Sequence, residues 1–203
     1  MDSSSYIQNI WLILAIWGFI YLTDYYLTIV SAKHHRDYLS EYISYDGSFE
    51  LTPKFQKDVD SLKPISPQFL VRWFLSILLI YFFWWLSTIV LLLPQFFYFL
   101  IGALILREVA THLRHFRNLS VYYFARNGGI KGRIEYPRSF VLKISAAEFF
   151  CFGFVCLVFA IFINSWFFLG GTLGCLVVAI QHWRLSQKAL ATTKGFHDKA
   201  KDD

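Results

Sequence analysis

The sequence predicts an all-α fold, a polytopic bundle of five membrane-spanning helices. Three observations predict it: the composition, five apolar segments and the distribution of basic residues. Of the 203 residues, 56% are hydrophobic, 20% are aromatic and 16% are charged, whereas a soluble domain averages about 25% charged residues. A soluble domain of this size needs a large polar surface. The composition therefore excludes a soluble enzyme domain, a disordered chain and a disulfide-stapled secreted module.

Apolar segments of the required length set the number of spans. A helix needs about 20 predominantly apolar residues to cross the hydrocarbon core. Two apolar segments are too long for one span each. We divide one before Pro94, because proline is favoured at the first position of a helix, and the other at Asn164-Ser165. The single transmembrane domain, 1–203, then contains spans at about 7–32, 67–93, 94–116, 140–163 and 166–185.

The basic residues support this topology. Six segments lie before, between and after the five spans, and in chain order, counted with the adjoining halves of the spans, they hold 0, 6, 0, 8, 0 and 5 Lys and Arg residues. The three segments without a basic residue are the N-terminus and the turns at Pro94 and Asn164. Basic residues concentrate on the cytoplasmic side of membrane proteins. We therefore expect an external N-terminus, a cytoplasmic C-terminus and cytoplasmic loops at 33–66 and 117–139. An integral protein of the plasma or inner membrane is the expected location.

Local signals organise the two loops. Thr52-Pro53 resembles a helix start, so a short helix is expected to run from there to about Leu62. Gly128 and Gly129 are expected to end a cytoplasmic extension of the third span. The segment that follows, 129–138, is expected to be extended or to form a hairpin.

The excess of basic residues suggests a partner. The sequence pI is about 9.1, and its basic groups are expected on one face of the membrane. Anionic lipid headgroups are attracted to such a face, so we expect membrane lipids and no nucleic acid as partners. The candidate headgroup contacts are Arg114, Arg117, Lys131, Arg133 and Arg138.

Three acidic residues lie within the spans and mark the candidate site. Asp24, Glu108 and Glu148 fall at similar depth in the cytoplasmic half if the topology is correct. Ionisable side chains are costly in lipid and usually face a protein interior or a water-filled cavity. In one interpretation the acids are neutralised by Arg107, Arg114 and Lys143 in a structural ion-pair network.

A metal site is a second interpretation. Glu108, His112 and His115 are separated by four and seven residues, so they share one helix face. Carboxylate and imidazole together suit Zn, Fe or Mn. The spacing is neither HExxH nor the ExxH pair of di-iron bundles. No cofactor is expected beyond this candidate divalent metal.

A polar pathway is the third interpretation and the preferred function. Five spans enclose little cavity, so an ion, proton or small-solute pathway predicts a homo-oligomer. A membrane-embedded, metal-dependent enzyme acting on a lipid and a non-catalytic scaffold subunit are the alternatives. We assign no catalytic residue, and the chain carries no GxSxG, Rossmann, P-loop or kinase motif. The expected pathway residues are Asp24, Arg107, Glu108, His112 and Glu148.

A GxxxG spacing on the last span suggests close helix packing. Gly170 and Gly174 lie four residues apart, and small residues at this spacing let two helices approach closely. The pattern is compatible with packing inside one chain and with dimerisation.

Overall fold

The computed structural model describes residues 9–45 and 55–199, without the side chains of Tyr45 and 192–199. It is an all-helical bundle, and five of its helices are long and apolar enough to cross a membrane. The predicted all-α fold is confirmed, and the structure has the five long apolar helices that the prediction requires. That they cross a membrane, and which side faces the cytoplasm, remain predictions. The five helices are α2 (Ile10–Asp37), α4 (Pro67–Trp84), α5 (Pro94–Arg126), α6 (Arg138–Ile163) and α7 (Trp166–Lys199).

The two predicted turns divide the apolar segments as expected. α4 continues through a π-helical stretch, η2 (Trp85–Val90), and Leu92 then adopts a positive φ of 54°. Pro94 is the first residue of α5. Asn164 ends α6 in the left-handed conformation with a φ of 48°, which asparagine tolerates better than most residues. α5 continues beyond its span to Arg126, just before Gly128 and Gly129, as expected, and α7 continues to Lys199.

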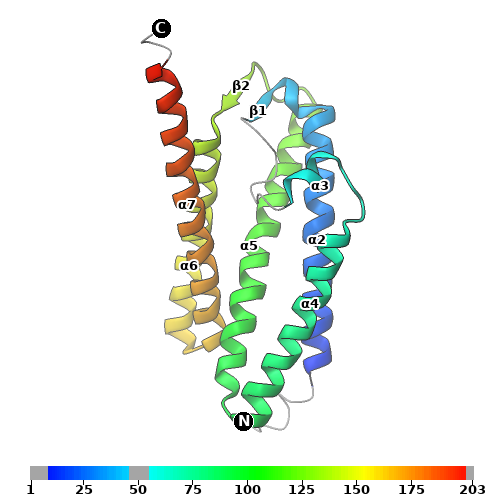
Figure 1. Cartoon of the computed structure of the whole chain (residues 1–203), viewed down its shortest axis with the longest axis vertical. Coiled ribbons are helices and arrows are strands. Elements are labelled where there is room, and N and C mark those ends of the chain that lie inside the picture. Colours follow the sequence, from blue (N-terminus) through cyan, green and yellow to red (C-terminus); the bar gives the residue numbers. More distant parts are fainter. Residues whose placement is uncertain (1–8, 46–54, 200–203) are drawn as a thin grey trace.

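α5 is the central helix of the bundle. α7 packs along both α5 and α6, and α2 packs along both α5 and α4 (Figure 1). The turns at Leu92 and Asn164 lie at one end, which we call the turn end. The short strands and the short helix α3 (Gln56–Asp60) lie at the opposite end, which we call the loop end (Figure 1).

Glycines bring α5 and α7 into backbone contact. A Cβ atom on Gly170 would overlap the carbonyl oxygen of Phe99, and one on Gly174 would overlap that of Ala103. Gly102 on α5 meets the carbonyl of Phe167 in the same way. The GxxxG spacing therefore serves packing between two helices of one chain.

A closely packed apolar core fills the bundle at the turn end. Trp17 of α2, Ile80 of α4 and both Phe97 and Ile101 of α5 are almost completely buried there. Trp17 satisfies its indole N–H through Ser76 Oγ on α4, at 2.9 Å. A smaller apolar cluster of α5, α6 and α7 lies nearer the loop end and includes Phe149 and Cys175.

The two loops pair with each other at the loop end. Strand β1 (Ile43–Tyr45) lies parallel to β2 (Ile134–Tyr136), and Ile43 is opposite Ile134. The extended segment expected within 129–138 is therefore present, and its partner is the other loop. This pairing joins segments that are far apart in the sequence, which local signals could not indicate. A 3₁₀ turn, η1 (Leu39–Glu41), leads from α2 into β1.

Ser66 organises the junction between α3 and α4. Its buried side chain accepts a hydrogen bond from Phe69 N at 3.2 Å, which caps α4, and donates one to Asp58. Lys63 Nζ donates to the same carboxylate at 3.2 Å. These two donors lower the pKa of Asp58. The predicted short helix is thus present, beginning at Gln56; its expected start at Thr52-Pro53 lies outside the described residues.

Gly170→Ala is expected to destabilise the protein by about 1–3 kcal/mol, because the added methyl group overpacks a backbone contact. Gly18→Ala is the matched control, since a Cβ there meets Trp73 at an ordinary 3.6 Å. Thermal unfolding in detergent measures both variants. Equal unfolding temperatures for the two variants would contradict the close crossing of α5 and α7.

Ser66→Ala is expected to lower stability by about 1 kcal/mol through loss of the α4 cap. The hydrogen bond from Ser66 to Asp58 adds a pH-dependent contribution to the free energy of unfolding. The pKa of Asp58 is lower in the folded state, so this part is present above the unfolded value of about 3.9. It disappears as the pH falls through the folded value. Denaturant titrations of the wild type, Ser66→Ala and the exposed control Ser61→Ala between neutral and acidic pH test this; a pH-independent difference would contradict it.

Candidate functional site

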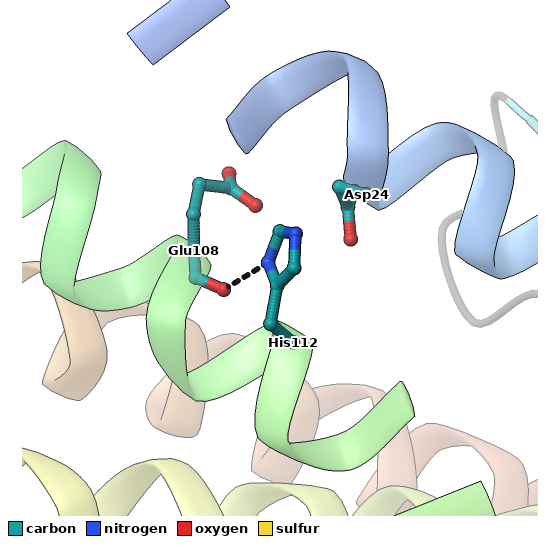
Figure 2. Close-up of side chains that lie close together, drawn as sticks. All are labelled: Asp24, Glu108 and His112. Carbon is teal, nitrogen blue, oxygen red and sulfur yellow. Dashed lines mark hydrogen bonds between the residues drawn. The ribbon is translucent and has the colours of Figure 1, made fainter. Parts of the chain in front are cut away.

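Asp24 of α2 converges with Glu108 and His112 of α5 inside the bundle. One candidate ligand atom from each residue lies within 4.8 Å of the other two, and the three side chains face one another across the helix interface (Figure 2). Asp24 and Glu108 each lie fourteen residues after the first residue of their helix, which is about 21 Å of helix. Because the hydrocarbon core is about 30 Å thick, the cluster is in the half nearer the loop end.

His112 is oriented by its own helix. Its Nδ1 lies 2.8 Å from the carbonyl oxygen of Glu108, one turn earlier, so Nδ1 carries the proton of this hydrogen bond. Its Nε2 therefore faces α2, 2.9 Å from Thr23 Oγ1. The second nitrogen of the ring is thus directed at the space between Asp24 and Glu108.

Glu108 has the most buried carboxylate of the cluster. Only 7% of its side chain is exposed, and the neighbouring Arg107 guanidinium pairs with its Oε1 atom. A buried charge without a partner would be strongly destabilising, which Arg107 prevents. This pair agrees with the ion-pair interpretation at that position.

His115 extends the cluster toward the loop end. Its Nε2 lies 3.0 Å from Asp24 Oδ1 and 3.3 Å from Thr28 Oγ1, and the contact with a carboxylate requires Nε2 to be the donor. The centroid of its ring is 6.4 Å from that of His112. His115 therefore contacts Asp24 and is not one of the three converging ligands, whereas the sequence grouped it with Glu108 and His112.

Glu148 lies apart from the other two acids. It pairs with Arg114, at 3.3 Å, and with Arg117, both on α5. The structure therefore divides the expected site residues into two groups. Asp24, Glu108, His112 and His115 lie at the interface of α2 and α5, and Glu148 pairs with its arginines between α5 and α6.

The remaining basic candidates lie at the loop end. Lys131 and Arg133 are exposed and Arg138 is half-buried, and Arg133 pairs with Glu135 of β2 at 3.0 Å. Their positions at one end of the bundle are compatible with the expected headgroup contacts, which stay a prediction.

Three hydroxyl groups near the histidines were missed at the sequence level. Thr23 and Thr28 are hydrogen-bond partners of His112 and His115, and Ser145 of α6 shares a 2.7 Å hydrogen bond with His182 of α7. The sequence held a signal for Thr28, because it lies one helical turn after Asp24 and therefore on the same face.

The site offers two carboxylates and one imidazole, a donor set that binds cations. No protein family, curated protein or solved structure was found to be similar to this chain, so its function has to be inferred from this geometry alone.

Proposed function

We propose that this multi-pass membrane protein binds a divalent metal ion between α2 and α5, with Asp24, Glu108 and His112 as ligands. The convergence of their three ligand atoms within 4.8 Å carries the proposal. An ion about 2.0–2.2 Å from each ligand atom holds any two of them no more than about 4.4 Å apart. Small side-chain rotations are therefore sufficient to close the site.

The surroundings of the ligands support a metal. Histidines that bind metals usually donate their other ring N–H to a carbonyl or carboxylate, and carboxylate ligands are themselves hydrogen-bonded. The His112 Nδ1 bond to the Glu108 carbonyl and the Arg107 pair with Glu108 Oε1 correspond to these two roles. Mixed carboxylate and imidazole ligands favour Zn²⁺, Mn²⁺ or Fe²⁺ over Ca²⁺.

Access to the metal is proposed from the loop end. Toward the turn end, the core around Trp17, Phe97 and Ile101 is apolar and almost completely buried. Toward the loop end, polar groups continue through His115 and Thr28. If the basic loops are cytoplasmic, as the charge distribution predicts, the metal is exchanged with the cytoplasm.

A proton or ion pathway is the second candidate function. The Asp24–His115 contact at 3.0 Å supports it, because a carboxylate bonded to an imidazole is a typical element of proton relays. The apolar core at the turn end blocks a continuous route within one chain. This function therefore needs a second conformation, or contact between copies in the homo-oligomer that we expected from the sequence.

Metal content tests the first candidate. Detergent-purified protein incubated with Zn²⁺ or Mn²⁺ and then desalted is expected to retain about one ion per chain. Asp24→Asn, Glu108→Gln and His112→Gln are each expected to lower affinity by about tenfold or more, because each removes a ligand. Elemental analysis measures the bound metal.

Two matched variants control for surface binding and for loss of fold. Glu135→Gln removes an exposed acid, and His182→Gln removes a histidine whose partner is Ser145 on another interface. Both are expected to bind like the wild type. Less than about 0.1 ion per wild-type chain, or equal losses in the controls, would contradict a specific site.

Proton flux tests the second candidate. In vesicles with a pH-sensitive dye, wild-type protein is expected to dissipate a pH gradient, and His115→Gln is expected to slow this by about tenfold, because it removes the imidazole that contacts Asp24. His34→Gln is the control, since His34 stacks on Tyr122 away from the cluster. Flux no faster than in empty vesicles would reject the pathway and leave the metal site unaffected.

A further inference from the structure

A hollow of about 160 Å³ lies between α5 and α6, on the side of α5 away from the metal-ligand candidates. Its apolar wall includes Leu113, Phe149 and Phe152, and its polar residues are Arg114, Arg117 and Glu148. α6 packs mainly against α7 and has little contact with α5. The hollow is therefore a consequence of how the three helices are arranged.

The hollow carries more positive than negative charge. Two guanidinium groups face one carboxylate, since both Arg114 and Arg117 pair with Glu148. The Arg114 guanidinium also lies 5.5 Å from the centroid of the Phe149 ring, over an apolar surface. Arginine binds phosphate with the same forked geometry that it uses for carboxylate. A phosphate would therefore compete with Glu148 for these two side chains.

The height of the arginines matches that of lipid phosphates. Arg114 and Arg117 lie 20 and 23 residues after Pro94, the first residue of α5, which is about 30 and 35 Å along the helix. The hydrocarbon core is about 30 Å thick, so both guanidinium groups reach the headgroup level of the leaflet at the loop end. Leu113 and Phe152, by contrast, present an apolar surface beside them. This argument holds whichever side of the membrane that leaflet faces.

We propose that this hollow binds one anionic phospholipid of the surrounding leaflet. Its phosphate binds Arg114 and Arg117, and one acyl chain lies against Leu113 and Phe152. Glu148 holds the two guanidinium groups in place and competes with the lipid phosphate. The proposal is independent of the metal site, because the two sets of residues lie on different faces of α5.

Native mass spectrometry of the detergent-purified full chain tests the proposal. The probes are phosphatidylglycerol and phosphatidylcholine with identical acyl chains. Wild-type protein is expected to retain one phosphatidylglycerol at least about tenfold more strongly than phosphatidylcholine, because the phosphatidylglycerol headgroup has no compensating positive charge. Arg114→Gln combined with Arg117→Gln is expected to abolish this preference, and Arg133→Gln, an exposed control, is expected to keep it.

The direction in which Glu148→Gln changes phosphatidylglycerol retention decides between the proposal and a purely structural role for the ion pairs. Removing the competing carboxylate is expected to strengthen phosphatidylglycerol retention by about threefold or more, whereas a purely structural ion-pair network predicts no gain. This variant keeps the test valid even if the double arginine variant fails to fold. Unchanged or weaker retention in Glu148→Gln, no preference in the wild type, or displacement of the lipid by millimolar inorganic phosphate would overturn the proposal.

Discussion

The arrangement of the bundle depends on providing partners for the polar side chains of α5 in the apolar interior of a bilayer. Polar groups in the hydrocarbon region must find partners within the protein. α5 carries Glu108, His112 and His115 within its span on one face, and Arg114 and Arg117 at the headgroup level on another. No single neighbouring helix could serve both faces. α5 therefore lies at the centre, where α2 supplies Asp24 to one face and α6 supplies Glu148 to the other.

The close contact between α5 and α7 shapes both candidate sites indirectly. Gly102, Gly170 and Gly174 let the backbones of α5 and α7 meet, and α6 packs mainly against α7. α6 is held one helix away at most heights. The space that remains near Arg114 is closed only in part, by Phe149. A packing motif that contains no polar side chain thus contributes to where charged groups remain accessible.

Much of the fold was predictable, because the relevant signals are local. Span lengths, Pro94 and Asn164 each reflect the backbone of a few consecutive residues, and the structure follows them closely. The site was predictable only in part. Helical spacing correctly gathered Glu108 and His112, but it could not tell which face of α5 meets α2. Depth suggested that Glu148 joins Asp24; rotation about the helix axis, which depth does not specify, separates them.

The pairing of β1 with β2 has a consequence for how the chain reaches its final form. Ile43 and Ile134 are about ninety residues apart in the sequence, and contacts over such separations form late because the intervening chain must first be ordered. During synthesis β2 emerges only after α2, α4 and α5 have been made. The two strands can therefore pair only after these three helices have been made, and the pair links the loop-end extensions of α2 and α5 to each other. The pair thus constrains, at the loop end, the two helices whose interface gathers Asp24, Glu108 and His112.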